Sequence, residues 1–385
     1  MHSNCMTIQS RLPNVGTTIF TVMSALAHEH QAINLSQGFP DFPSSSRLVD
    51  LVHYYMRSGQ NQYAPMAGVP ALREQLAKKI QHQYGVAVDP MSEITITAGA
   101  TQALFTAITA LVHPGDEVIM LEPAYDSYRP AIELSGGIPI IYEMQAPDYQ
   151  VDWSAVQALI TPRTRMLIIN TPHNPTGTIL RKADIETLDQ LLAGTDIILL
   201  SDEVYEHLIF GEEPHESILR YPRLRERSLA VYSFGKTFHN TGWKIGYCVA
   251  PDFLSAEFRK VHQFNVFSVN TPVQYALAEF LQQPEEYLEL PNFYERKRDY
   301  LNMAMHGSRL RPLPSWGTYF QLFDYSAISN ESDLTFARRL TTEFGVAAIP
   351  VSAFYSSGRD ARVIRLCFAK KEDTLAQAGA LLQKV

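Results

Sequence analysis

The sequence predicts an α/β fold with a large domain on a mainly parallel sheet and a smaller α/β domain beside it. Short apolar segments of strand length alternate with segments of helical periodicity, which is the pattern of repeated strand-helix units. Those strand segments are continuous apolar runs, as expected for a sheet covered by helices on both faces. The chain has 385 residues, which favours more than one domain.

The first strand-helix-strand unit occupies residues 93–121. Residues 93–98, EITITA, are short and rich in β-branched side chains, and residues 101–112 carry apolar side chains at helical spacing. The turn HPGD precedes a second apolar run at 117–121. The connection between the first strand and its helix is therefore tight, and it ends in small residues.

The same alternation continues along the large domain. Helical patterns at 153–160 and 183–194 separate further apolar runs. Together with the first unit these runs make seven predicted strands, and the additional five are 138–144, 165–170, 196–203, 229–234 and 245–250. We therefore predict that residues 47–285 form the large domain.

A different pattern follows the large domain. A long polar helix is predicted over about 284–307, and the later strands belong to a second sheet that is antiparallel or mixed. We predict that residues 286–385 form the smaller domain and that residues 1–46 pack onto it. Its other predicted elements are strands at 318–325 and 362–369 and helices at 333–345 and 372–385.

Composition excludes several classes of protein. Hydrophobic residues make up 46% and charged residues 19%, which suits a folded chain with a sizeable core. The formal net charge of −8 argues against general nucleic-acid binding, and no apolar run is long enough for a membrane helix. The N-terminus lacks the apolar centre of a signal peptide, and the three cysteines form no CxxC pair, so we expect neither zinc nor disulfides. We expect a cytoplasmic protein.

Polar residues collect after the predicted strands, where ligands bind in open α/β sheets. Gly99, Ala100 and Thr101 follow the first strand and open a helix, so their backbone N–H groups could bind an anion such as phosphate. The same residues are also compatible with a tight turn capped by Thr101. This short motif alone does not separate the two interpretations.

Two further strand ends carry polar side chains. Asn174 lies in the rigid turn TPHNPTG after one strand, where it could be either a ligand or a structural Asx-turn residue. Asp202 ends a strand that looks fully buried, and Tyr205 follows three residues later. A buried carboxylate needs a cation or hydrogen-bond donors, so Asp202 is either functional or a cap of the next turn.

The next strand ends at Ser233, with Lys236 three residues beyond it. A single lysine is normally a solvated surface residue. The GxxxxGK[ST] motif of a nucleoside-triphosphate site and the GxGxxG motif of a dinucleotide site are both missing from the expected places. One cofactor uses all of these groups: pyridoxal 5′-phosphate has an aldehyde for a lysine, a ring nitrogen for an aspartate, a phenolic oxygen and a phosphate.

Six segments in this order resemble the class I/II aminotransferases, which are fold-type I pyridoxal-phosphate enzymes. They are NQYAPMAGVPALR, TAGATQAL, NTPHNPTG, SDEVYEHL, SFGKTFHNTGWKIGY and IRLCFA. The similarity runs from about residue 12 to the C-terminus. LPNVGTTIFTVMSALA and INLSQGFPDF resemble the glutamine/kynurenine aminotransferase branch, and bacterial methionine aminotransferases most of all.

The resemblance implies a role for each cofactor-site residue. Lys236 would form the Schiff base and then move a proton between the substrate Cα and the cofactor C4′. Asp202 would keep the ring nitrogen protonated, and Asn174 and Tyr205 would hydrogen-bond the ring's 3′ oxygen. The phosphate would be held by Ser233, Lys244 and the backbone of Gly99, Ala100 and Thr101. Lys244 stands where the family usually has arginine, so the charge remains and the bidentate contact is lost.

Tyr125 would stack on the ring face, and Tyr63 would reach the phosphate from the neighbouring subunit, which implies a homodimer with shared active sites. On the substrate side, Arg365 would bind the α-carboxylate, a group that suits its two-pronged donor. Gly38 would let the backbone approach the substrate, and Asn174 would lie beside it. Phe20, Phe39 and Tyr63 would form an aromatic side-chain pocket, although core packing would explain Phe20 and Phe39 nearly as well.

The expected reaction is a two-step transamination between an L-amino acid and a 2-oxo acid. No motif places a second arginine for an acidic side chain, so an uncharged bulky substrate is expected, methionine first and aromatic amino acids next. A C–S β-lyase on the same scaffold is the alternative. A transcription regulator with an aminotransferase-like domain would need an added DNA-binding domain, for which about 45 N-terminal residues leave no room.

Overall fold

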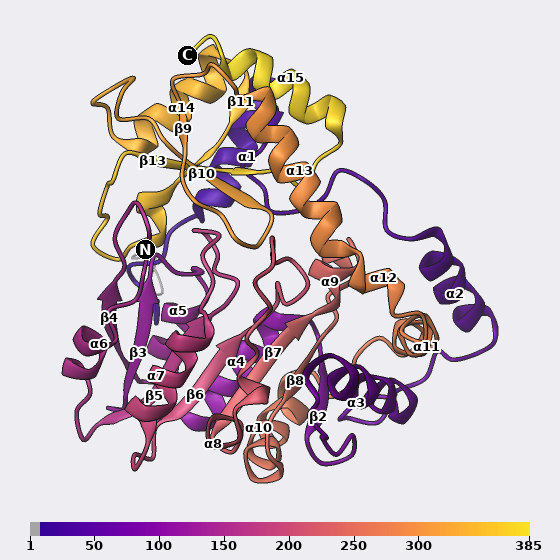
Figure 1. Cartoon of the computed structure of the whole chain (residues 1–385). Coiled ribbons are helices and arrows are strands. Elements are labelled where there is room, and N and C mark those ends of the chain that lie inside the picture. The colour runs from indigo at the N-terminus through magenta and orange to yellow at the C-terminus, as the bar shows by residue number, and fades with distance from the viewer. Residues whose placement is uncertain (1–7) are drawn as a thin grey trace, which may run out of the picture.

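The computed structural model describes residues 8–385. A large β-sheet forms the core of the lower part of the structure in Figure 1. Within the described residues it has seven strands in the order β2-β8-β7-β6-β5-β3-β4. β8 runs antiparallel to both of its neighbours, and the other pairs are parallel, which confirms the mainly parallel sheet. The strands are β2 (Ile94–Thr97), β3 (Glu117–Glu122), β4 (Ile138–Glu143), β5 (Thr164–Asn170), β6 (Ile198–Asp202), β7 (Ser228–Ser233) and β8 (Gly246–Val249).

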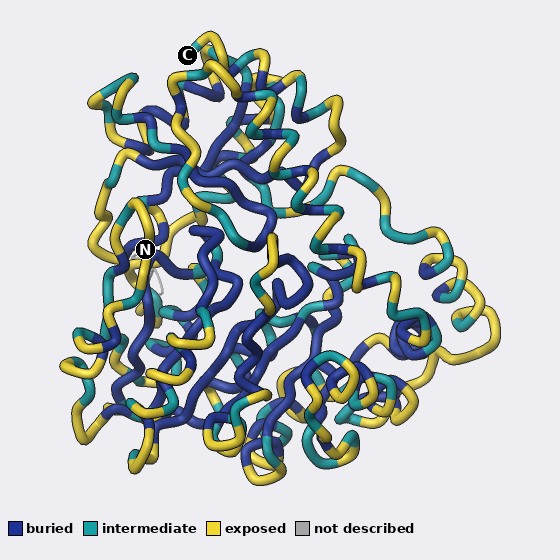
Figure 2. Tube along the Cα trace, viewed as in Figure 1, coloured by how far each residue is buried: buried dark blue, intermediate teal, exposed yellow. Residues whose placement is uncertain are grey.

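Helices cover both faces of this sheet, which explains the continuous apolar runs. Met120, Ile168 and Leu200 pack on one face in the same cluster as side chains of α4, α5 and α10. Their sequence neighbours point to the opposite face, which α6 and α7 cover. In Figure 2 the central strands are buried along most of their length. These helices are α4 (Ala100–Leu111), α5 (Tyr128–Leu134), α6 (Trp153–Ala158), α7 (Lys182–Leu192) and α10 (Asp252–Asn265).

A second group of elements lies above the carboxyl ends of the large sheet, at the top of Figure 1. It contains an antiparallel sheet in the order β12-β13-β10-β9, flanked by α1, α13 (Leu290–Ala304), α14 and α15. The N-terminal segment joins this group, because β1 (Ile33–Asn34) pairs in parallel with β11 (Val346–Ala347). The remaining bounds are α1 (Ile19–Glu29), β9 (Arg311–Pro312), β10 (Phe320–Asp324), α14 (Asp333–Glu343), β12 (Ile349–Pro350), β13 (Val363–Cys367) and α15 (Glu372–Leu382). The exact domain boundaries stay a prediction.

The long helix expected over about 284–307 is instead two helices. α12 covers Glu285–Leu288, and α13 covers Leu290–Ala304. Pro291 lies in the first turn of α13, where its missing N–H costs no helical hydrogen bond, so a new helix begins there. Three further helices pack on one another next to β2: α3 contacts that strand, and α11 packs against both α3 and α2. They are α2 (Ser46–Arg57), α3 (Pro70–Tyr84) and α11 (Thr271–Phe280).

Residues 8–385 contain neither a membrane-spanning helix nor a cluster of metal ligands. Within residues 8–385, no helix combines the length and the apolar character that a membrane crossing requires. In the same range, no three His, Cys, Asp or Glu side chains lie close enough together to hold a metal ion.

Candidate active site

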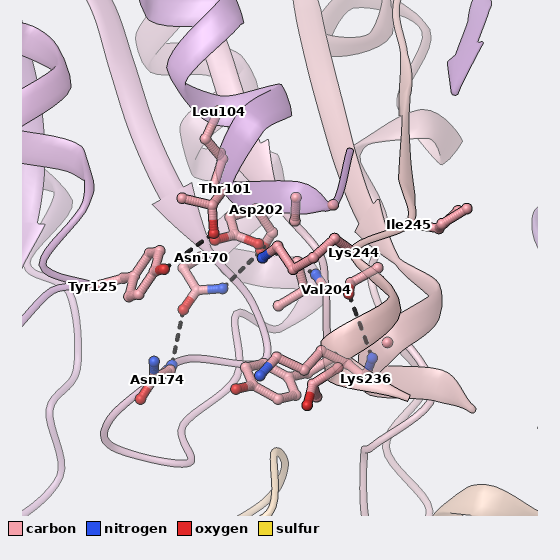
Figure 3. A pocket seen from close by; sticks show the side chains of 16 residues that line it. Thr101, Leu104, Tyr125, Asn170, Asn174, Asp202, Val204, Lys236, Lys244 and Ile245 are labelled. Atoms are coloured by element: carbon pink, nitrogen blue, oxygen red, sulfur yellow. Dashed lines mark hydrogen bonds between the residues drawn. The ribbon is translucent and has the colours of Figure 1, made fainter. Parts of the chain in front are cut away.

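A cavity opens at the carboxyl ends of the central parallel strands (Figure 3). Asn170, Asp202 and Ser233 are the last residues of β5, β6 and β7, so the parallel register brings the ends of these strands together. Ten of the predicted cofactor-site residues line this cavity. The complete lining is Gly99, Ala100, Thr101, Leu104, Tyr125, Asn170, Asn174, Asp202, Val204, Tyr205, Ser233, Gly235, Lys236, Thr241, Lys244 and Ile245.

Small residues and a lysine amine meet at one end of the cavity. Gly99 has φ of 82° and directly precedes α4, so the exposed N–H groups of that helix begin beside it. A Cβ atom on Gly99 would lie 3.4 Å from the Nζ of Lys244, which is ordinary contact distance, so the lysine amine lies directly beside this glycine. A helix N-terminus and an ammonium group both favour an anion, and this end of the cavity therefore suits a phosphate.

Asp202 is a buried carboxylate with few partners. Its side chain is 3% exposed, and Tyr128 donates a hydrogen bond of 2.6 Å to Oδ2. The backbone N–H of Val204 donates a longer one of 3.3 Å to Oδ1. Burial raises the pKa of Asp202 to about 6, against the lowering effect of these two donors. A cation placed in the cavity would stabilise the ionised form.

Lys236 lies on α9 (Phe234–Thr237), a single helical turn where the sequence suggested a plain turn between two strands. Ser233 caps this turn by accepting a hydrogen bond from the backbone N–H of Lys236, at 3.4 Å. Desolvation lowers the pKa of the Lys236 amine to about 8, and the nearby charges of Lys244 and Arg365 add to this. A substantial neutral fraction of this amine therefore exists near neutral pH.

Arg365 comes from β13 and approaches the cavity from the opposite side. It is 1% exposed, and its guanidinium carbon lies 3.7 Å from the centre of the Phe320 ring. Nη1 donates to Oδ1 of Asn174 at 2.7 Å, and Nη2 donates to the carbonyl of Ser36 at 3.1 Å. Nε has no partner among the described residues. Asn174 thus links this arginine to the cavity.

The remaining predicted residues divide into two groups. The backbone of Gly38 reaches the site, because its carbonyl accepts hydrogen bonds from Lys236 and Tyr319. The ring of Phe20 lies 5.4 Å from the Arg365 guanidinium carbon. Two aromatic residues lie elsewhere: Phe39 is 46% exposed and packs against Lys370, and Tyr63 is 82% exposed and lies against Phe267.

The structure adds three residues that sequence reasoning missed. Asn170 ends β5, and its side chain both donates to the carbonyl of Asp202 and accepts from the N–H of Asn174, at 2.8 Å each. Its position at the end of a predicted strand could have identified it. Tyr128, three residues after Tyr125, and Tyr319, inside a predicted strand segment, had no distinguishing signal in the sequence.

Comparison with known proteins agrees with this geometry. Residues 30–380 match the family described as aminotransferase class I and II. The methionine aminotransferase of Escherichia coli (strain K12) is 56% identical over 386 residues and all of both chains. A crystal structure from E. coli, described as identifying a methionine aminotransferase function, superimposes with a TM-score of 0.97 over 99% of this chain and 100% of the other.

More distant relatives share the fold. Human kynurenine–oxoglutarate transaminase 1 is 33% identical over 97% of each chain. An aspartate aminotransferase structure from Thermus thermophilus, with maleate, is 32% identical and has a TM-score of 0.90, covering 98% of this chain and 100% of its own. The fold alone therefore does not select the substrate. The chain belongs to the class I and II aminotransferases, and it is a fold-type I enzyme that depends on pyridoxal 5′-phosphate.

Proposed function

We propose that this enzyme transfers the amino group of methionine, and of other uncharged bulky L-amino acids, to a 2-oxo acid. The observation that carries the proposal is the 56% identity, over the complete length of both chains, to the E. coli methionine aminotransferase. The match covers all of both chains, so it includes every segment that lines the cavity. The lining of the approach to the site supports the same substrate class.

A wide groove leads to the cavity, and Tyr125 lines both. Apolar side chains form one part of the groove wall, including Val15, Ile19 and Phe354. The carboxyl group of Asp126 lies in the same groove. Arg129, also in the groove, is paired with Glu133 at 2.8 Å. An apolar side chain would bury surface against these apolar residues. An acidic side chain would meet the carboxylate of Asp126, and the only other arginine among the described residues of the groove is Arg338.

The residues of the cavity fit the cofactor. Lys244, Ser233 and the start of α4 would hold the phosphate, and Asp202 would face the ring nitrogen. Asn174 and Tyr205 would hydrogen-bond the phenolic oxygen. When bound, the protonated ring accepts the negative charge that develops when the substrate loses its Cα proton. Asp202 supports this chemistry because, among residues 8–385, its buried carboxylate forms no ion pair and has only Tyr128 and the N–H of Val204 as donors.

The chain itself would bind the substrate and move the proton. Arg365 would hold the α-carboxylate, with the Phe320 ring and Asn174 keeping the guanidinium in place. Lys236 would take the proton from the substrate Cα and return it at the cofactor C4′. An amine with a pKa of about 8 can do both near neutral pH, because its neutral and charged forms are both populated.

We also propose a homodimer that shares its active sites. Tyr63 is 82% exposed and Phe267 48%, and their rings pack at a centre distance of 5.3 Å. Exposed aromatic rings in one place are typical of a protein interface. A second copy would cover them and bring Tyr63 to the neighbouring phosphate. We further propose a cytoplasmic location, which rests on the sequence features given above.

The function is tested with a panel of amino acids and 2-oxo acids. The purified protein is incubated with the cofactor, and the exchange products are measured for each pair. We expect the oxo acid derived from methionine to form only when a second oxo acid is supplied. Release of pyruvate and ammonia from cystathionine, without an oxo acid, would instead favour the C–S β-lyase.

A further inference from the structure

Tyr319 occupies a position beside the lysine amine that the proposed reaction leaves unexplained. It is 0% exposed, and its hydroxyl lies between Lys236 and the backbone of Gly38. Lys236 Nζ donates to the Tyr319 oxygen at 2.8 Å, and the same hydroxyl donates to the Gly38 carbonyl at 2.5 Å. Lys236 Nζ also lies 3.4 Å from that carbonyl.

We propose that Tyr319 is a positioning residue that holds the free amine of Lys236 and aims its lone pair at the substrate Cα. This inference rests on the proposed function, because it requires Lys236 to be the group that moves the proton. During the reaction the substrate takes the place of the lysine on the cofactor. The released amine then needs a fixed position from which to accept the Cα proton.

The hydrogen bonds determine the direction of the lone pair. A neutral amine has two N–H groups and one lone pair. Tyr319 gives its own proton to Gly38, so its oxygen acts as an acceptor toward Lys236. With one N–H directed to Tyr319 and the other to the Gly38 carbonyl, the lone pair points away from both acceptors. Lys236 also lines the cavity, so we infer that its lone pair faces the space that the substrate would occupy.

The packing of Tyr319 makes it a rigid support. Its ring meets Tyr205 edge-on at 5.2 Å and Phe320 at 4.8 Å between ring centres. Thr318 directly precedes Tyr319 and has φ of 68°. Its backbone N–H donates to the carbonyl of Leu208 at 2.8 Å, which fixes the backbone next to Tyr319. The support therefore comes from a segment other than α9, which carries the lysine.

The chain offers a matched control for the hydroxyl. Tyr294 is also 0% exposed, its ring lies 6.0 Å from that of Tyr319, and its hydroxyl has no hydrogen-bond partner among the described residues. Tyr319→Phe and Tyr294→Phe each remove one buried oxygen from the same aromatic cluster. Only the first removes a contact to Lys236.

The first measurement uses the loaded enzyme in a single turnover with methionine, either normal or deuterated at Cα. In Tyr319→Phe, we expect the rate constant of the first half-reaction to fall by about tenfold or more, as for a misplaced proton-transfer group. The deuterium isotope effect should rise, because proton removal becomes more rate-limiting. Tyr294→Phe should behave like the native enzyme in both respects.

The second measurement uses the cofactor-free protein and does not depend on activity. Lysine labelled with ¹³C at Cε is titrated by NMR, and Lys236 is assigned by its missing signal in Lys236→Arg. The titratable groups around this amine are Lys244, Arg365, Asp202 and the buried thiol of Cys367, and both variants retain them. Loss of one acceptor should lower the Lys236 midpoint by about one pH unit in Tyr319→Phe alone.

Unchanged titration and an unchanged isotope effect in Tyr319→Phe would overturn the inference, as would equal changes in Tyr294→Phe. Failure of Tyr319→Phe to fold, when Tyr294→Phe folds, would also overturn it, because the hydroxyl would then be a structural requirement. A native protein inert toward every amino acid would contradict the proposed function instead. The titration would still report on the contact between Tyr319 and Lys236.

Discussion

Replacing Asp202 with asparagine should stabilise the cofactor-free protein while weakening cofactor binding. The carboxylate is 3% exposed, and burial raises its pKa from 3.8 to about 6. A carboxyl group with a higher pKa in the folded protein than in the unfolded chain takes up a proton on folding between those two pH values. Its contribution to stability is therefore complete below about pH 4 and is lost as the pH rises to about 6.

The size of the effect follows from the two pKa values. Each pH unit between them corresponds to about 1.4 kcal/mol, so the ionised carboxylate costs the folded protein about 3 kcal/mol at pH 7. Asparagine has nearly the same shape, stays neutral and can still accept the hydrogen bond from Tyr128. We expect Asp202→Asn to raise the free energy of unfolding by about 3 kcal/mol at pH 7 and by almost nothing at pH 4.

The assay is urea unfolding of the cofactor-free native protein and variant at several pH values between 4 and 7. Asp50→Asn makes the same chemical change at an exposed position on α2, and it should alter stability little at any pH. With cofactor present the order should reverse, since the amide cannot pair with a charged ring nitrogen. A variant less stable than the native protein at pH 7, or a difference independent of pH, would refute the reasoning.

Four further predictions concern the remaining site residues. Lys236→Ala should fold but lose cofactor attachment and nearly all transamination. After borohydride reduction of the native enzyme, mass spectrometry should find the cofactor on Lys236, and a cofactor on another lysine would contradict the assignment. Arg365→Lys should raise KM for donor and acceptor alike by about tenfold or more, because one edge of the guanidinium is lost, and steady-state kinetics with both substrates would show this. Lys244→Ala should lower the affinity for pyridoxal 5′-phosphate, measured by equilibrium dialysis, more than the affinity for pyridoxal. Equal losses of affinity for the two ligands would argue against a phosphate contact. Tyr63→Ala mixed with Lys236→Ala should regain activity as hybrid dimers, whereas independent sites would give no recovery.

Much of the fold was predictable because strand burial leaves a strong signal. The seven strands of the large sheet, in residues 8–385, were all found as apolar runs, and three of them end in polar site residues. The strand ends also explain why Asp202, Asn174 and Lys236 became candidates. Each had a structural explanation when taken alone, and only their combination at one edge of the sheet pointed to a cofactor.

The rest of the site depends on tertiary contacts that leave no local pattern. Tyr128 and Tyr319 are two of 19 tyrosines in the chain, and only their hydroxyl partners distinguish them. Lys244 adopts φ of 56°, which a sequence would suggest for glycine or asparagine but not for lysine. Phe39 was placed in the side-chain pocket on the family resemblance, and it is 46% exposed and packs against Lys370, so its role stays a prediction.

Substrate choice is the most direct test of the proposed function. The enzyme is assayed with methionine and with aspartate as amino donors, using the same 2-oxo acid and saturating cofactor. The apolar groove and the carboxylate of Asp126 predict that kcat/KM for methionine exceeds that for aspartate by at least about two orders of magnitude. Comparable values, or a preference for aspartate, would contradict the account, because a cation would then have to pair with the acidic side chain in this pocket.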